Sequence, residues 1–74
     1  MKRYFFDFVN ERQTLHDFEG QEFLTARAAC EQANLLAIDL HIDCDSEWVG
    51  WKVAVRDALG HLLHSIPVPA RELH

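Results

Sequence analysis

The chain has 74 residues, of which 49% are hydrophobic and 26% charged, and its formal net charge is −5 at pH 7. This composition excludes a disordered tail. Its seven basic residues are scattered, which argues against a nucleic-acid partner, because such affinity comes mainly from Lys and Arg. No apolar run approaches the roughly 18 residues of a membrane helix, and the N-terminus lacks the pattern of a signal peptide. We therefore expect a single cytoplasmic domain over residues 1–74, without membrane contact.

The chain opens with an aromatic stretch, "RYFFDFV", at residues 3–9. Successive side chains of a strand point to opposite faces. One face then carries Tyr4, Phe6 and Phe8, and the other carries Phe5, Asp7 and Val9. Residues 10–13 are polar and predict a turn, and residues 14–20 predict a second strand that ends at Gly20.

A helix is predicted after Thr25, whose hydroxyl suits an N-cap. Apolar residues then recur at steps of three and four, which marks one face of the helix. The members of this face are Ala26, Ala29, Ala33, Leu36 and Leu40, widened by Cys30 and Ala37. We expect the helix to end near residues 42–46.

Two further strands are predicted, at residues 48–56 and 61–68, around a turn at residues 57–60. Pro67 offers no ladder N–H and is expected at an edge or a strand end. The order is ββαββ. It predicts an α+β fold, a two-layer sandwich with one amphipathic helix packed on one face of a four-stranded sheet made of two hairpins.

Five short motifs resemble those of a family of small bacterial proteins known only as a domain of unknown function. They are "RYFFDF" at 3–8, "DFEGQEF" at 17–23, "ARAAC" at 26–30, "VRDALG" at 55–60 and "IPV" at 66–68. The resemblance implies the same ββαββ order. It implies no activity and no functional residues.

The candidates for chemistry are weak. The stretch "DLHIDCDSE" at residues 39–47 offers carboxylates but lacks the glycine and the spacing of an EF-hand loop. His61 and His64 are an odd number of residues apart, so a strand would point them to opposite faces. Cys30 is expected as a small core residue, and the acids around Cys44 suppress its thiolate.

We therefore expect no catalytic residue, no metal site and no cofactor. The alternative is a weak metal-binding protein or small enzyme that uses the acidic, Cys and His residues of 39–47.

One question remains, which is what covers Phe5 and its neighbours, since one helix covers only one face. The candidate interface consists of Phe5, Val9, Trp48, Ala54 and Leu63. Lys52 and Arg56 can fold over this strip, a second copy can pack on it, or an edge strand can pair across a two-fold axis. We favour a homodimer. The predicted function is a non-enzymatic protein-interaction or regulatory module that self-associates and presents an acidic helix to a basic protein partner.

Overall fold

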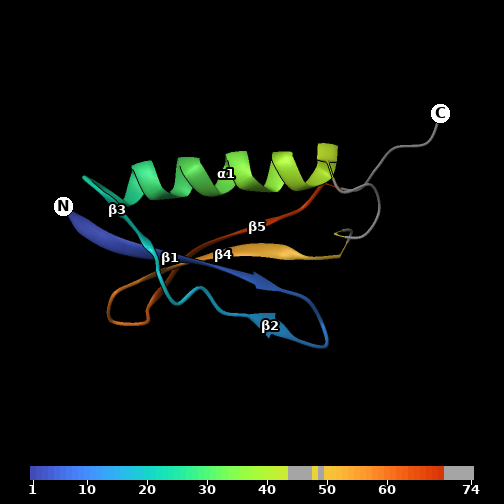
Figure 1. The fold of residues 1–74 in the computed structure, drawn as a ribbon, viewed down its shortest axis with the longest axis horizontal. Coiled ribbons are helices and arrows are strands. Elements are labelled where there is room, and N and C mark those ends of the chain that lie inside the picture. The colour runs from blue at the N-terminus through green and yellow to red at the C-terminus, as the bar shows by residue number, and fades with distance from the viewer. Residues whose placement is uncertain (44–47, 49, 70–74) are drawn as a thin grey trace.

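The structure is a computed structural model, and it describes residues 1–43, 48 and 50–69. Its elements in chain order are β1 (Lys2–Val9), β2 (Thr14–Leu15), β3 (Gln21–Phe23), α1 (Ala26–Asp43), β4 (Lys52–Asp57) and β5 (Leu62–Pro67). The strands form one antiparallel sheet, and α1 runs along one of its faces (Figure 1). The predicted α+β fold with one helix on a sheet is confirmed.

The sheet has the strand order β2-β1-β4-β5, and β3 also pairs with β1. β2 and β3 share the edge of β1 that faces away from β4. β2 pairs with Phe8 and Val9, whereas β3 pairs with Lys2, Arg3 and Tyr4. The predicted continuous strand over residues 14–20 is therefore wrong. It ends at Leu15, because Asp17 engages the backbone around it in a turn, and pairing resumes only at Gln21.

The core lies between α1 and the sheet. Its buried members are Tyr4, Phe6, Val53 and Val55 from the sheet, and Ala29, Ala33 and Ala37 from the helix. The small helix residues let the backbone of α1 approach the sheet closely. The Thr25 hydroxyl accepts the N–H of Ala28 at 3.1 Å, which confirms the predicted N-cap.

The last two strands are shorter than predicted. Strand pairing begins at Lys52 instead of residue 48, because Gly50 adopts a φ of +90° and Trp51 donates its N–H to the carbonyl of Trp48. β5 covers Leu62–Pro67 instead of residues 61–68. The turn between them is as predicted, since the Asp57 carboxylate accepts the N–H groups of Leu59 and His61.

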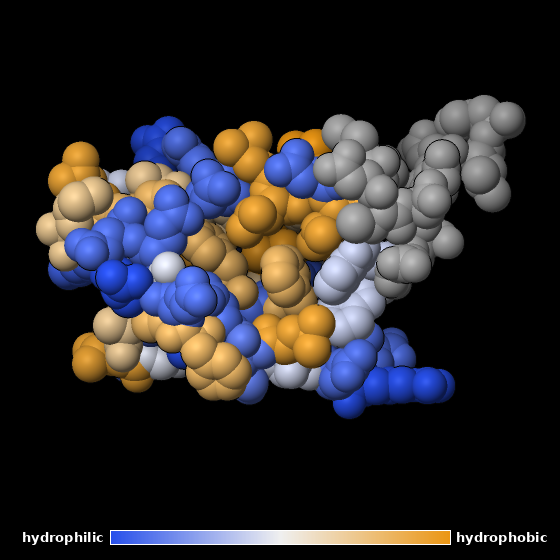
Figure 2. All heavy atoms as spheres, viewed as in Figure 1, coloured by the Kyte–Doolittle hydropathy of each residue, from blue (hydrophilic) through white to orange (hydrophobic). Residues whose placement is uncertain are grey.

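The helix contacts β4 and β5 more than β1, so it is displaced from the β2 side of the sheet. Figure 2 shows apolar residues gathered between α1 and β2. A hollow of about 290 Å³ lies in this region, lined by Phe6, Phe8, Leu15, His16, Asp17 and Leu36. Among the described residues, no helix is long and apolar enough to cross a membrane.

Candidate functional site

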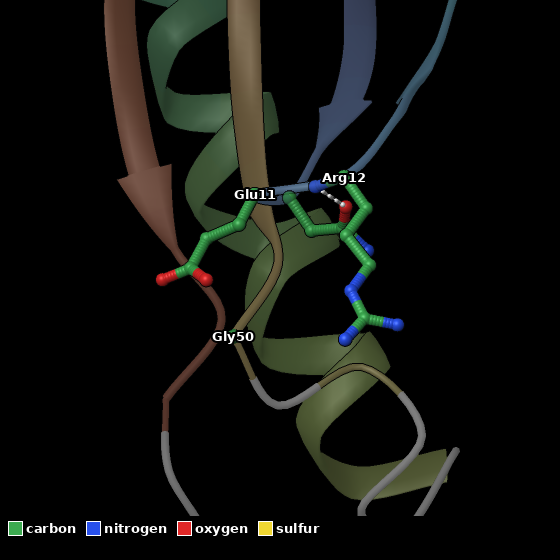
Figure 3. Close-up of a pocket in the computed structure, with 4 residues that line it drawn as sticks. Glu11, Arg12 and Gly50 are labelled. Atoms are coloured by element: carbon green, nitrogen blue, oxygen red, sulfur yellow. Dashed lines mark hydrogen bonds between the residues drawn. The ribbon is translucent and has the colours of Figure 1, made fainter.

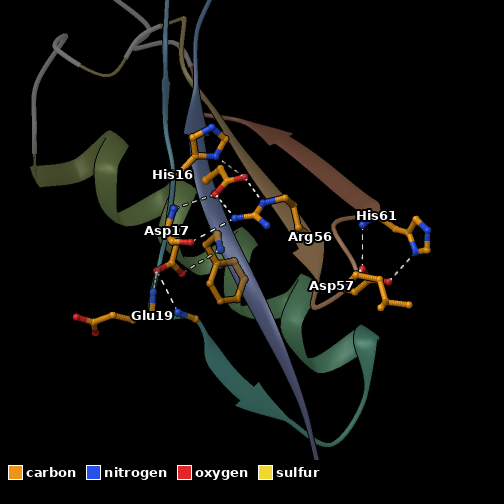
Figure 4. A network of polar contacts seen from close by, with 10 residues as sticks. His16, Asp17, Glu19, Arg56, Asp57 and His61 are labelled. Atoms are coloured by element: carbon orange, nitrogen blue, oxygen red, sulfur yellow. Dashed lines mark hydrogen bonds and ion pairs between the residues drawn. The ribbon is translucent and has the colours of Figure 1, made fainter.

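The buried charged group of the sheet is Asp7, on the face of β1 that points away from α1. We call this face the outer face. The side chain of Asp7 is 5% exposed, although it carries a charge. Arg56 of β4 meets it with two bonds, Nε to Oδ2 at 2.5 Å and Nη2 to Oδ1 at 3.1 Å (Figure 4). A bidentate arginine fixes the orientation of a carboxylate as well as its charge.

A tight turn at residues 17–20 is attached to this ion pair. The backbone N–H of Asp17 donates to Asp7 Oδ1 at 2.9 Å, and its carbonyl accepts from Arg56 Nη2 at 3.3 Å. The Asp17 carboxylate accepts three backbone N–H groups, from Phe6, Glu19 and Gly20. We call Asp7, Asp17 and Arg56 the clasp, because together they hold the turn on the sheet.

Gly20 allows the turn to lie flat on β1. Its φ is +70°, a conformation that residues with a side chain rarely adopt. A Cβ atom built here would lie 2.8 Å from the carbonyl oxygen of Tyr4 and 2.8 Å from the ring of Phe5. Only glycine therefore fits this close approach of the two chain segments.

The pKa shifts within the clasp favour the ionised forms of all three side chains. Burial alone raises the pKa of Asp7, but the hydrogen bonds from Arg56 and from the Asp17 N–H outweigh it, and the pKa lies below its ordinary value. Burial also raises the pKa of Asp17, and its three backbone donors lower it further than burial raises it. The hydrogen bond to Asp7 raises the pKa of Arg56. The clasp is therefore fully charged at neutral pH.

Phe5 lies under this cluster. The guanidinium carbon of Arg56 is 5.0 Å from the centre of the Phe5 ring, within the range of a cation–π contact. Arg56 thus folds over Phe5, which is the first of the three arrangements considered from the sequence. His16 lies beside the pair, with Nδ1 3.7 Å from Asp7 Oδ2.

The turn presents Phe18 to solvent, with 88% of the residue exposed. A hollow of about 470 Å³ lies next to it on the outer face, lined by Phe5, His16, Asp17, Phe18, Arg56 and Gly60. The members of the clasp bond to one another, so this surface combines satisfied polar groups with an exposed ring.

Residues 3–69 match the model of a protein family, the domain of unknown function DUF6894. The chain belongs to the DUF6894 family. Comparison with curated proteins and with solved structures found no match. The resemblance drawn from the motifs is thus confirmed at the level of a small domain family without an assigned activity. In this DUF6894 chain the "DFEGQEF" motif forms the clasped turn and β3.

The structure places the predicted interface residues in different surroundings. Phe5 and Val9 are half-buried on the outer face, and Ala54 is buried there, directly across from Asp7. Leu63 is 41% exposed on β5. Trp48 lies apart from these four, because its ring packs on Phe8 and Trp51, and Phe8 belongs to the helix-facing side.

The candidate ligands of metals are dispersed. His61 pairs with Asp57, 3.2 Å away, while His64 lies exposed on β5. Within residues 1–43, 48 and 50–69, no group of three His, Cys, Asp or Glu residues could hold a metal ion. Cys30 is a free, half-buried cysteine. Residues 44–47, with Cys44, Asp45 and Glu47, lie outside the described residues, and so do the side chains of His41 and Asp43.

Another hollow, of about 310 Å³, lies at the β1–β2 turn and is lined by Asn10, Glu11, Arg12 and Gly50 (Figure 3). The Asn10 side chain accepts the N–H groups of Arg12 and Gln13, so its carboxamide oxygen serves the turn. The Asn10 oxygen is therefore already engaged within the turn. The lining Glu11 and Arg12 are exposed.

Sequence reasoning missed the clasp. The available signal was a charged residue, Asp7, within an apolar strand, together with one basic residue, Arg56, in another strand. Asp7 and Arg56 are 49 positions apart, so only the pairing of β1 with β4 reveals that they are diagonal neighbours. The role of Asp17 could have been inferred from the D-x-E-G pattern, which is typical of a turn stabilised by an aspartate side chain.

Proposed function

We propose that this DUF6894 chain is a non-enzymatic protein-interaction module that self-associates. One observation carries the proposal. The polar groups of the outer face bond to one another, while apolar groups remain exposed, namely Phe18 on the clasped turn and Leu62 on β5. Exposed apolar groups next to polar residues are typical of protein interfaces.

Charge supports the same proposal. Arg56 neutralises Asp7, and no Asp, Glu, Lys or Arg lies within Leu62–Pro67. Each copy has a net charge of −5, but two facing β5 strands would bring no acidic or basic side chains of their own against each other. The free thiol of Cys30 agrees with a reducing cytoplasm, which we retain as the proposed compartment.

A basic protein partner belongs to the proposal as well. On α1, Glu31 is paired with Arg27 at 3.4 Å, and Asp39 is exposed. Asp17 and Glu19 add negative charge beside Phe18. A partner with basic residues around an apolar side chain would complement this surface electrostatically.

Self-association is tested by light scattering on a sizing column over a concentration series. The expected mass is twice the 8.6 kDa of one chain. A mass of one chain at every concentration up to the millimolar range would contradict the proposal. The Phe18→Ser variant, measured alongside, shows whether the clasped turn takes part, because it removes the ring and leaves the clasp intact.

A further inference from the structure

We propose that two copies of this chain pair through the free edge of β5 and form one continuous antiparallel sheet, with Ser65 on the two-fold axis. This inference rests on the proposed self-association and names the surface that serves it. Among the described strands, β5 ends the sheet, and only β4 pairs with it.

The direction of the β5 backbone groups follows from its pairing with β4. Val68 donates its N–H to the carbonyl of Trp51 at 2.9 Å, and these two residues fit the register of the ladder. Hydrogen-bonded and non-hydrogen-bonded pairs alternate in an antiparallel ladder. Ile66 and His64 therefore bond to β4, whereas the N–H and C=O groups of Ser65 point to the free edge.

Pro67 has the same parity as Ser65, so its missing N–H removes no bond to β4. Its carbonyl points to the free edge. The alternation does not continue to Leu63, because the ladder is irregular there: Val55 pairs with His64 and Arg56 already with Leu62. Past this irregularity Asp57 donates its N–H to the carbonyl of His61 at 3.0 Å, so His61 and Leu63 are the positions that bond to β4. The free edge thus offers the N–H and carbonyl of Ser65 and the carbonyl of Pro67.

A second copy of β5 complements this edge when Ser65 lies on the axis. The Ser65 N–H of each copy then donates to the Ser65 carbonyl of the other copy. On the outer face, Leu63 of one copy packs on Pro67 of the other, which covers apolar surface that is exposed in the single chain.

Two features favour a second copy over a charged peptide. The strand contains no Asp, Glu, Lys or Arg, so it has no permanent charge that would pair with a charged partner. Natural edge strands are protected by charges, prolines or bulges. In β5, Leu62–Ser65 are all exposed, and pairing is limited only by Pro67 and by the irregularity at residues 62–64.

The neighbouring register, with His64 on the axis, is less favourable. It places the two His64 side chains against each other and extends the pairing past Leu62, where the irregularity bends the strand. It also sets Ser65 opposite Leu63, whose N–H points to β4, so the Ser65 carbonyl lacks a donor. The two registers make different predictions for cross-linking.

The test measures the mass of the full chain by light scattering for the wild type, Ser65→Asp and Asn34→Asp. Ser65→Asp places two carboxylates face to face on the axis, and we expect the mass to fall to that of one chain. Asn34 is exposed on α1, so Asn34→Asp adds the same charge elsewhere and should leave the dimer unchanged. Circular dichroism confirms that each variant is folded.

The outcomes separate the two proposals. A monomeric wild type overturns the proposed self-association and this inference with it. A dimeric wild type whose mass is unchanged by Ser65→Asp overturns the β5 interface alone and leaves self-association in place.

Cross-linking tests the register. Cα atoms of a hydrogen-bonded antiparallel pair are about 5.5 Å apart, within the range of a disulfide. Ser65→Cys should therefore give a covalent dimer with oxidised glutathione, whereas the wild type and Asn34→Cys, which carry the same native cysteines, should not. Cross-linking by His64→Cys but not by Ser65→Cys would overturn the register.

Discussion

The carboxylate of Asp17 accepts the backbone N–H of Phe6 at 3.2 Å, at a point where β1 has no partner strand on that edge. β2 pairs with the end of β1 and β3 with its beginning, so the N–H of Phe6 between them would otherwise have no acceptor on this edge. A side chain thus completes the hydrogen bonding of the strand. The same carboxylate also holds the turn that displays Phe18.

The ion pair of the clasp should make a measurable contribution to stability. Asp7→Ala leaves Arg56 without its carboxylate and Asp17 N–H without its acceptor, and we expect the free energy of unfolding to fall by about 2–3 kcal/mol. This is below the roughly 3–5 kcal/mol of a fully buried pair, because Arg56 is 26% exposed. Urea denaturation measures the change. The double variant Asp7→Ala/Arg56→Ala should lose less than the sum of the two single variants, and strict additivity would contradict the coupling.

Gly20 and Gly60 form a matched pair of tests, since both have a positive φ. Gly60→Ala meets nothing within 4 Å, so only the backbone cost of about 1–2 kcal/mol is expected. Gly20→Ala adds a clash with the Tyr4 carbonyl, for which overpacking costs of about 1–3 kcal/mol are typical. Thermal unfolding of the two variants should rank Gly20→Ala clearly below Gly60→Ala. Equal losses would show that the turn does not lie as close to β1 as described.

Acid should weaken the clasp. The folded-state pKa values of Asp7 and Asp17 lie below their unfolded values, so the unfolded chain binds more protons in acid. The stabilisation is complete above an unfolded pKa of about 3.9 and is lost as the pH falls through the folded values. Urea denaturation between pH 6 and pH 3 should therefore show stability that declines with acid. Asp17→Asn should flatten this decline, and an unchanged slope would assign the acid dependence to other carboxylates.

The close approach of α1 to the sheet depends on small residues. Ala33 is fully buried between the helix and β4, so Ala33→Leu should destabilise the fold by about 1–3 kcal/mol through overpacking. Asn34→Leu places the same side chain on the exposed side of α1 and serves as the control. Thermal unfolding compares the two. A smaller effect of Ala33→Leu than of Asn34→Leu would contradict the packing.

The sequence by itself determined the features that depend on neighbouring residues. Alternation assigned Tyr4 and Phe6 to the core and Phe5 and Asp7 to the other face, because the side-chain period of a strand is two. The Thr25 cap and the Asp57 turn follow from side chains that bond to backbone groups two to four residues away. These interactions are local, so the residues that make them can be read in order along the chain.

Only the tertiary structure decided the break between β2 and β3 and the assembly of the clasp. The "TLHDFEG" stretch alternates well enough for one strand, but Asp17 forms its bonds in the turn only once β1 lies beside it with Asp7 held by Arg56. The contact of Arg56 with the Phe5 ring likewise depends on the tertiary structure, because Arg56 reaches this ring from β4. Contacts between residues 49 positions apart depend on strand order and register, and the local periodicity of a sequence specifies neither.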